Sequence, residues 1–460
     1  MCLELIGRRP RGYRSMGDIK QVGQREAGLP KVFGRHQMAM VAVGAIISYG
    51  LMTGAGFPLS LAGPGVVVSY LAASVVVLLM AYCLAEMAAR HPMPGAFGSY
   101  AEAYLGAGSG FVVRSAYVVG LLCIIGTEME LLGSALTPML PGLSATLVSV
   151  LGLIAIMGVN LLPAQWFARL EFSLSAVKVA ALLFFVGCAW RVFFQSEATL
   201  PAPQSLQAAG EMLYWKGILE AFVLAVLGYA GMESLAVAAG ETTASPGIIR
   251  RVIHTTAWLL VGLALAVVVV SVAVSMLGIL PLSGPPMAFI LRQSGVPAGW
   301  MNIAIAVAVL SVLNSQLYGA SRMLFSLGRA ERRLHWLGEL RGGSPRNAVL
   351  AVGVVSLLVF AFFKLYMFQT FIAATTIASS CLLLVWLMVF FSYLRFRQQA
   401  APLRQSDRAL ASWPAWGGVV LVVGVALSTW RLEPFELTLM IGGPFLLVLC
   451  LVYMLFFRLR

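Results

Sequence analysis

The chain has 460 residues, of which 60% are hydrophobic and only 11% are charged. Soluble domains carry about 25% charged residues, so this composition excludes an ordinary soluble globule, and the apolar content excludes a disordered chain. The net charge of +13 suits a nucleic-acid binder only when it covers one soluble face, so its distribution along the chain decides its meaning.

The first 36 residues form a basic tail with eight Lys or Arg and no apolar run of signal-peptide length. Beyond the tail, twelve apolar runs are long enough, at about 17 to 25 residues, to cross a bilayer as helices. They cover residues 38–60, 66–88, 111–135, 144–163, 170–193, 217–240, 255–280, 299–325, 348–366, 369–394, 415–431 and 435–457. The pattern predicts an all-α polytopic membrane protein with twelve transmembrane helices and short loops.

The basic residues are concentrated on one side of this predicted bundle. With the tail in the cytosol, 25 Lys and Arg are assigned to the cytosolic side and five to the other, which leaves only Lys178, in the fifth run, assigned to neither side. The positive-inside rule then predicts a multi-pass protein of the inner (cytoplasmic) membrane with both termini cytosolic. The charge therefore needs no nucleic-acid partner, the lipid bilayer is the expected surrounding, and the sequence indicates no oligomeric state.

Residues with catalytic or metal-binding chemistry are scattered. Five of the six cysteines lie in apolar runs, and the four histidines flank such runs without metal-ligand spacing. No Ser-His pair, acidic cluster or phosphate-binding glycine loop lies within the spans. We therefore predict that the protein is not an enzyme, has no catalytic residues, and holds no metal or cofactor.

Glycines interrupt the first and the sixth apolar runs. Gly44, Gly50, Gly54 and Gly56 lie in the first, and Gly228 and Gly231 lie close together in the sixth. Glycine-broken segments at matching positions of two halves indicate a secondary transporter with an inverted repeat, although small-residue helix packing explains glycines equally well. The predicted divisions are a cytosolic tail (1–36), a first repeat (37–196), a second repeat (197–396) and two final helices (397–460).

Several segments resemble the bacterial amino acid permeases of the amino acid-polyamine-organocation superfamily. They are GRHQMAMVAVGAII (34–47), Gly63-Pro64-Gly65, LAEMAARHPMPGAFGSYAEAYLG (84–106), GMESLAVAAGETTASPGIIRRVI (231–253) and SVLNSQLYGASRMLFSLGRA (311–330). The resemblance implies the leucine-transporter-type fold, a 5+5 inverted repeat in which helices 1 and 6 are broken. It also implies uptake of an amino acid driven by an ion gradient.

A helix interrupted at membrane depth offers free main-chain groups to a zwitterion. By resemblance, the substrate carboxylate meets the N–H groups of Tyr49, Gly50 and Leu51. Its ammonium meets carbonyls near Ile46, Leu227 and Ala230, and its side chain lies toward Tyr229.

The first break departs from the family pattern. Ser48-Tyr49-Gly50 replaces a glycine-x-glycine, and Met52 replaces a frequent aromatic residue. Ser48 still tolerates an irregular turn and supplies a hydroxyl, whereas Tyr49 either faces the substrate or packs outward. The class of amino acid, neutral or cationic, therefore stays open.

Lys178 lies eight residues into the fifth run, roughly 12 Å along a helix. An ionised lysine at that depth needs partners, unless its side chain reaches the interface. By resemblance it occupies the place that sodium holds in sodium-coupled relatives, facing carbonyls at Gly44 and Ile47. We therefore expect proton coupling with Lys178 as the titrating group, with sodium coupling as the alternative.

Few other polar groups lie inside the spans. Glu128 and Glu130 are about 200° apart on a helix, so only one of them can face a pocket. That residue contacts an amine, relays a proton, or is structural. Glu233 follows the second break, as a coupling or structural residue, and Ser311 and Ser315 share a stripe that either packs on other helices or lines the cavity near Lys178.

The sequence thus predicts a secondary active transporter that takes up an amino acid with protons by alternating access. An amino acid, amine or polyamine exchanger on the same fold is the alternative. A channel and a nutrient sensor are the less favoured alternatives. Glycine-broken helices also occur in channels, which saturable, gradient-driven accumulation would exclude, and the tails offer no signalling domain for a sensor.

Overall fold

The computed structural model describes residues 17–195, 215–276, 286–366, 368–400, 411–431 and 437–455. Throughout these ranges the chain is helical apart from turns and two isolated β-bridges. The α-helices are α2 (Gly17–Arg25), α3 (Arg35–Ile46), α4 (Tyr49–Met52), α5 (Gly56–Ala62), α6 (Val66–Arg90), α7 (Ala96–Leu105), α8 (Ala107–Leu136), α9 (Ala145–Leu161), α10 (Ala164–Gln195), α12 (Trp215–Gly228), α13 (Ser234–Ala239), α14 (Pro246–Met276), α15 (Pro286–Gln293), α16 (Ala298–Ala330), α17 (Arg346–Tyr366), α18 (Phe368–Ala400), α19 (Trp413–Ser428) and α20 (Leu437–Tyr453). The 3₁₀ turns are η1 (Gly63–Gly65), η2 (Thr137–Met139), η3 (Arg332–Gly338) and η5 (Thr429–Arg431).

The described residues include seven helical stretches that are long and apolar enough to cross a membrane. Three shorter apolar helices are found at Ala145–Leu161, Trp413–Ser428 and Gly442–Tyr453. The two predicted runs that belong to neither group, 38–60 and 217–240, are those in which the structure interrupts the helix. The total of twelve spans and the boundaries of the repeats stay predictions.

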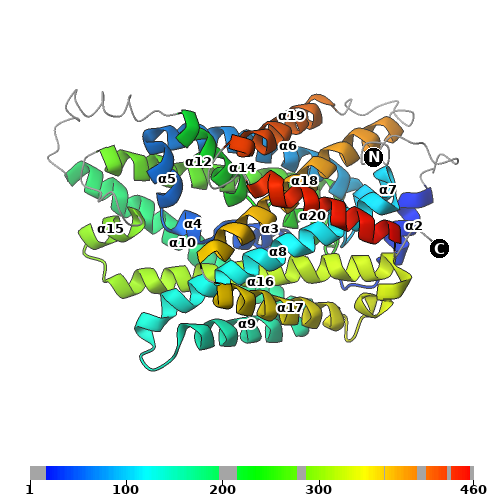
Figure 1. The fold of residues 1–460 in the computed structure, drawn as a ribbon, viewed down its shortest axis with the longest axis horizontal. Helices are drawn as coiled ribbons and strands as arrows, with labels where there is room; N and C mark the ends of the chain where they lie inside the picture. Colours follow the sequence, from blue (N-terminus) through cyan, green and yellow to red (C-terminus); the bar gives the residue numbers. More distant parts are fainter. Residues whose placement is uncertain are drawn as a thin grey trace.

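Three helices that the sequence did not predict, α2, α7 and α15, are each ten residues or shorter. They are too short to cross a bilayer, which is why a search for apolar runs passes over them. In Figure 1, α2 and α7 lie at one end of the long axis, and α5 and α15 lie at the other.

The helices α8 and α16 form the centre of the bundle. They pack extensively against each other and, together with α18, are the most buried of the long spans. By contrast, α10 leaves most of its apolar surface exposed, as expected of a helix that faces lipid, and contacts α3 and α16 along one face. A polar side chain on that face is therefore enclosed by three helices.

The first interruption lies between α3 and α4. The first helix ends at Ile46, the Ser48 N–H donates to the Ile46 carbonyl oxygen at 2.8 Å, and helical structure resumes at Tyr49. The second lies between Gly228, where α12 ends, and Ser234, where α13 begins.

The two interruptions are in direct contact. Gly231 has a φ of +106°, in the left-handed region that favours glycine. A Cβ atom at this position would also lie 2.5 Å from the Cβ of Ala45. Glycine is therefore required at 231 both by the backbone conformation and by the close approach of α3.

Candidate substrate-binding and coupling site

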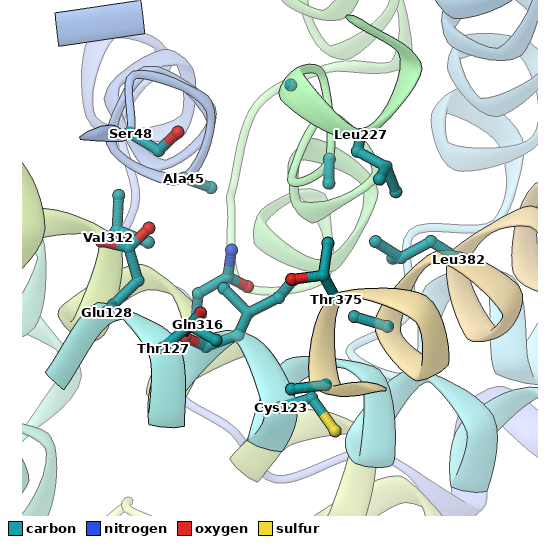
Figure 2. A pocket seen from close by; sticks show the side chains of 15 residues that line it. Ala45, Ser48, Cys123, Thr127, Glu128, Leu227, Val312, Gln316, Thr375 and Leu382 are labelled. Atoms are coloured by element: carbon teal, nitrogen blue, oxygen red, sulfur yellow. Dashed lines mark hydrogen bonds between the residues drawn. The ribbon is translucent and has the colours of Figure 1, made fainter. Parts of the chain in front are cut away.

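A cavity with a volume of about 150 Å³ lies between the two interruptions and three long helices. Figure 2 shows Ser48, Val312 and Glu128 on one side of it in this view, and Leu227 and Leu382 on the other. The residues that line it are Ala45, Ser48, Cys123, Ile124, Thr127, Glu128, Leu227, Gly228, Ala230, Val312, Gln316, Ala374, Thr375, Ala378 and Leu382. The lining is mostly apolar with a few polar groups, as in sites that bind small molecules.

The start of α4 presents main-chain donors beside this cavity. Tyr49, Gly50 and Leu51 follow the cavity-lining residue Ser48 and form the first turn of the helix, whose N–H groups have no partner within the helix. A Cβ atom at Gly50 would meet nothing within 4 Å, so the backbone there is accessible. The side chain of Tyr49 lies outside the described residues.

The other predicted substrate contacts are divided between the cavity and the core. Leu227 and Ala230 line the cavity, whereas the side chain of Ile46 is 1% exposed and the adjacent Ala45 takes its place in the lining. The hydroxyl of Tyr229 is 2.9 Å from the hydroxyl oxygen of Ser74 on α6. The Tyr229 ring therefore contacts α6 and is absent from the lining.

The two neighbouring glutamates of α8 have different surroundings. Glu128 lines the cavity, is 6% exposed, and its Oε2 atom has no hydrogen-bond partner among the described residues. Glu130 pairs with Lys364 of α17 at 2.6 Å, and its side chain is 46% exposed. Glu128 is thus the acidic side chain available to a bound solute.

Lys178 lies directly behind the first interruption. Its Nζ donates to the carbonyl oxygens of Gly44 at 2.6 Å and of Ile47 at 3.0 Å. The residue is 1% exposed, so its side chain turns into the bundle and does not reach the interface. These carbonyls belong to the end of α3, where a lysine ammonium offsets the negative end of the helix dipole.

Glu171 of α10, which the sequence analysis did not single out, lies beside Lys178 in the bundle. It is 1% exposed, and its carboxylate accepts hydrogen bonds from Ser311 and Asn314 of α16, each at 2.5 Å. Glu171 lies near the start of a predicted span, where an acidic residue is expected at the interface. Its spacing of seven residues from Lys178, two helical turns on one face, is the signal that could have identified it.

Ser311 and Ser315 hold neighbouring helices and are absent from the cavity lining. Ser311 donates to Glu171, and Ser315 donates to the carbonyl oxygen of Val41 at 3.2 Å. The adjacent positions Val312 and Gln316 line the cavity instead, and Figure 2 shows Gln316 reaching toward its middle. A rotation of about 100° per residue separates the two faces, and sequence spacing alone gave no reason to prefer one.

Glu233 organises the second interruption. It is fully buried, accepts the N–H of Gly231 at 3.0 Å, and accepts the indole N–H of Trp386 on α18 at 3.3 Å. The carboxylate therefore satisfies a main-chain donor that the interrupted helix leaves free, and it ties this segment to α18.

Within the described ranges, no group of three or more His, Cys, Asp and Glu side chains is arranged to hold a metal ion. The polar groups around the cavity are main-chain amides, hydroxyls, one amide side chain and one carboxylate. Such a set can recognise the carboxylate and ammonium of a zwitterion by hydrogen bonds.

Solved structures with the same arrangement of helices are transporters. The manganese transporter of Eremococcus coleocola, solved as a mutant, aligns with a TM-score of 0.60 at 12% identity, over 97% of this chain and 96% of that chain. The nucleobase-cation-symport-1 family transporter Mhp1 aligns with a TM-score of 0.57 at 17% identity, over 93% and 95% of the two chains. The chain thus has the leucine-transporter-type fold.

Sequence comparison identifies nearer relatives. The chain is 32% identical over 332 residues to the amino-acid permease RocC of Bacillus subtilis (strain 168), which covers 69% of each chain. It is 25% identical to the gamma-aminobutyric acid permease of the same strain, over 95% of both chains. It is also 25% identical to the aromatic amino acid transport protein AroP of Salmonella typhimurium (strain SL1344), over 93% of this chain and 97% of that protein. The model of the amino acid permease family matches residues 37–432, and the chain therefore belongs to that family.

Proposed function

We propose that this permease carries a neutral or cationic amino acid into the cell together with a proton, by alternating access across the inner membrane. One observation carries the proposal: the cavity adjoins two interrupted helices, and Lys178 lies buried directly behind the first interruption. The cavity supplies a place for the solute, and the lysine supplies a group that can gain and lose a proton.

The substrate carboxylate binds the N–H groups of Tyr49, Gly50 and Leu51, which have no partner within the single turn of α4. The ammonium binds carbonyl oxygens of the interruptions near Leu227 and Ala230, which line the cavity. Both groups thereby recover the hydrogen bonds that they lose with water.

Glu128 selects for or against a second amine on the substrate, or relays a proton. Its unpartnered, nearly buried carboxylate oxygen supports this role, because a carboxylate in such surroundings is stabilised by a cation. Relatives include permeases named for gamma-aminobutyric acid and for aromatic amino acids, so family membership alone does not identify the substrate.

Proton release from Lys178 weakens its two hydrogen bonds to the end of α3. A neutral amine has two N–H groups and no charge, so it interacts more weakly with the carbonyls of Gly44 and Ile47. The helix α10 then loses one of its attachments to α3, and the cavity can open to the other side. The charge asymmetry of the sequence supports a cytosolic position for the end that carries α2.

The test is uptake by proteoliposomes that contain the purified chain, with a radiolabelled mixture of the twenty amino acids as probe. We expect accumulation under an inward proton gradient, and its loss in Lys178→Met. Sodium-driven uptake that ignores pH, or full activity of Lys178→Met, would overturn the proposal. A requirement for preloaded amino acid would assign exchange, and competition by single unlabelled amino acids, polyamines and γ-aminobutyrate identifies the substrate.

A further inference from the structure

The carboxylate of Glu171 occupies the space that a side chain at position 44 would need. A Cβ atom built on Gly44 would overlap the Oε1 atom of Glu171 and lie 2.6 Å from its Cδ atom. From the same helix, Lys178 donates to the carbonyl oxygen of Gly44 at 2.6 Å. Glu171 and Lys178, two turns apart on α10, therefore both pack against Gly44 of α3.

The hydrogen-bond donors to Glu171 are all neutral. Ser311 and Asn314 donate from α16, and Ser175 donates from α10 at 3.2 Å. The single hydroxyl hydrogen of Ser175 is shared between Glu171 and the carbonyl oxygen of Met40 on α3. Ser315 of α16 donates to the carbonyl oxygen of Val41, so this polar cluster joins α3 to both α10 and α16. The donors stabilise a carboxylate but do not compensate its charge.

The charged groups that face one another here come from two helices. Lys178 interacts electrostatically with Glu171 on its own helix and with Glu128 on α8, and Lys178 is the cation that acts on Glu171. On α3 and α16 the neighbouring groups are carbonyls, hydroxyls and one amide. Two buried charges without direct contact stabilise each other, so loss of either raises the cost of keeping the other ionised.

We propose that Glu171 is the positioning partner of Lys178, which keeps the lysine protonated while α3 is docked and thereby sets the pH range of proton-coupled transport. This inference rests on the proposed proton coupling. Glu171 acts through Lys178 and α3, and does not contact the cavity where the solute binds.

The direction in which Glu171→Gln shifts the pH profile of uptake follows from the loss of the negative charge. In Glu171→Gln the amide oxygen can keep the bond from Asn314, while the NH₂ group replaces the oxygen that accepts from Ser311 and can donate to that hydroxyl instead. The shape and most of the hydrogen bonding are kept, but the negative charge is gone. Lys178 then gives up its proton more readily, so the pH profile of uptake moves to more acidic values, by about one pH unit for a nearby opposite charge. Glu171→Asp keeps the charge and is expected to keep the midpoint of the wild type.

The experiment measures uptake of the radiolabelled amino acid mixture by proteoliposomes between pH 5 and 8, at a fixed proton gradient. The wild type, Glu171→Gln and Glu171→Asp are compared with the matched control Glu130→Gln, which lies on α8 outside the cluster. An acid shift in Glu171→Gln alone supports the proposal. An unchanged profile in Glu171→Gln, with Lys178→Met inactive, overturns this inference and leaves the proposed function intact.

Full activity of Lys178→Met, or no uptake by the wild type, overturns the proposed function and this inference with it. Should Glu171→Gln fail to fold, the double variant Glu171→Gln/Lys178→Met decides by a double-mutant cycle. A linked pair predicts that the double variant recovers monodisperse protein in detergent. If the double variant loses as much monodisperse protein as the two single variants together, the pairing is refuted.

Discussion

Lys178 and Arg114 are both buried cations, but their charges are stabilised in different ways. Lys178 is held by two carbonyls of α3, with Glu171 nearby on the same helix. Arg114 of α8 pairs with Glu102 of α7 at 2.8 Å and with Glu26 at 3.1 Å. One cation is a titratable amine beside an interrupted helix, and the other is a permanently charged guanidinium in a dense ion-pair network.

The arginine network joins segments that are far apart in the sequence. The carboxylate of Glu26 accepts hydrogen bonds from the Gly95 N–H at 3.0 Å, from Ser99 at 2.6 Å and from Ser326 of α16. Arg25 pairs with Glu102 at 2.7 Å, which ties the end of α2 to α7. Because a guanidinium keeps its proton at physiological pH, this network, which we call the latch, can open only by movement of its segments. The role proposed for Lys178 requires instead that its amine gains and loses a proton.

The largest effect is expected from exchanging Lys178 for arginine, which tests whether this cation must lose its proton. Lys178→Arg keeps the positive charge near the α3 carbonyls but removes the ability to lose a proton at physiological pH. We expect a folded protein in which accumulation driven by a pH gradient is abolished, measured in proteoliposomes. The control is Lys364→Arg, which retains its exposed pair with Glu130. Wild-type accumulation by Lys178→Arg would contradict the titrating role.

Removing Glu26, one of the two acidic residues of the latch, is expected to destabilise the protein. Glu26→Ala leaves the buried Arg114 without one carboxylate, and breaking a buried pair in this way costs about 3 to 5 kcal/mol. The measurement is the thermal unfolding midpoint in detergent. Glu339→Ala, whose pair with Arg341 is exposed, is the control and should lose at most about 1 kcal/mol. Equal losses in both variants would refute the latch.

A methyl group at position 44 tests the close contact between α3 and Glu171. Gly44→Ala forces the carboxylate away and is expected to destabilise the protein by about 1 to 3 kcal/mol, the usual cost of overpacking. Gly158→Ala on α9, where a Cβ atom would meet nothing within 4 Å, is the matched control. A lowered unfolding midpoint is expected for the first variant only.

The smallest expected effect is a pH dependence of the latch. Burial opposes ionisation of Glu102, but Arg114 and Arg25 outweigh it and hold its pKa below the ordinary value. Its stabilising contribution is therefore complete above the unfolded pKa of about 4.3 and is lost as the pH falls through the folded value. The difference in unfolding midpoint between the wild type and Glu102→Gln should shrink below about pH 4. A difference that is constant with pH would disprove the charge effect.

The sequence predicted the helices better than the surroundings of their side chains. Apolar length alone located the long spans, because a bilayer imposes a minimum number of residues. The latch was not predicted, since α2 and α7 are too short to be found as apolar runs. The burial of Arg114 depends on glycines such as Gly98, where a Cβ atom would lie 2.5 Å from the Arg114 Cγ.

Within the site, the contacts of Lys178 could be anticipated because resemblance to a family linked it to the carbonyls of Gly44 and Ile47. The acid beside it was missed, because Glu171 is buried by α16, whose orientation no local pattern reveals. The same orientation directs Gln316 and not Ser315 to the cavity.

In the proposed mechanism, a proton crosses the membrane with each amino acid through Lys178. The most direct test of this coupling is the lumenal pH of proteoliposomes that hold a pH-sensitive dye and start without a gradient. Addition of the amino acid mixture outside should acidify the lumen with the wild type and leave it unchanged with Lys178→Met. Amino acid uptake by the wild type without acidification, or equal acidification by the variant, would contradict the account.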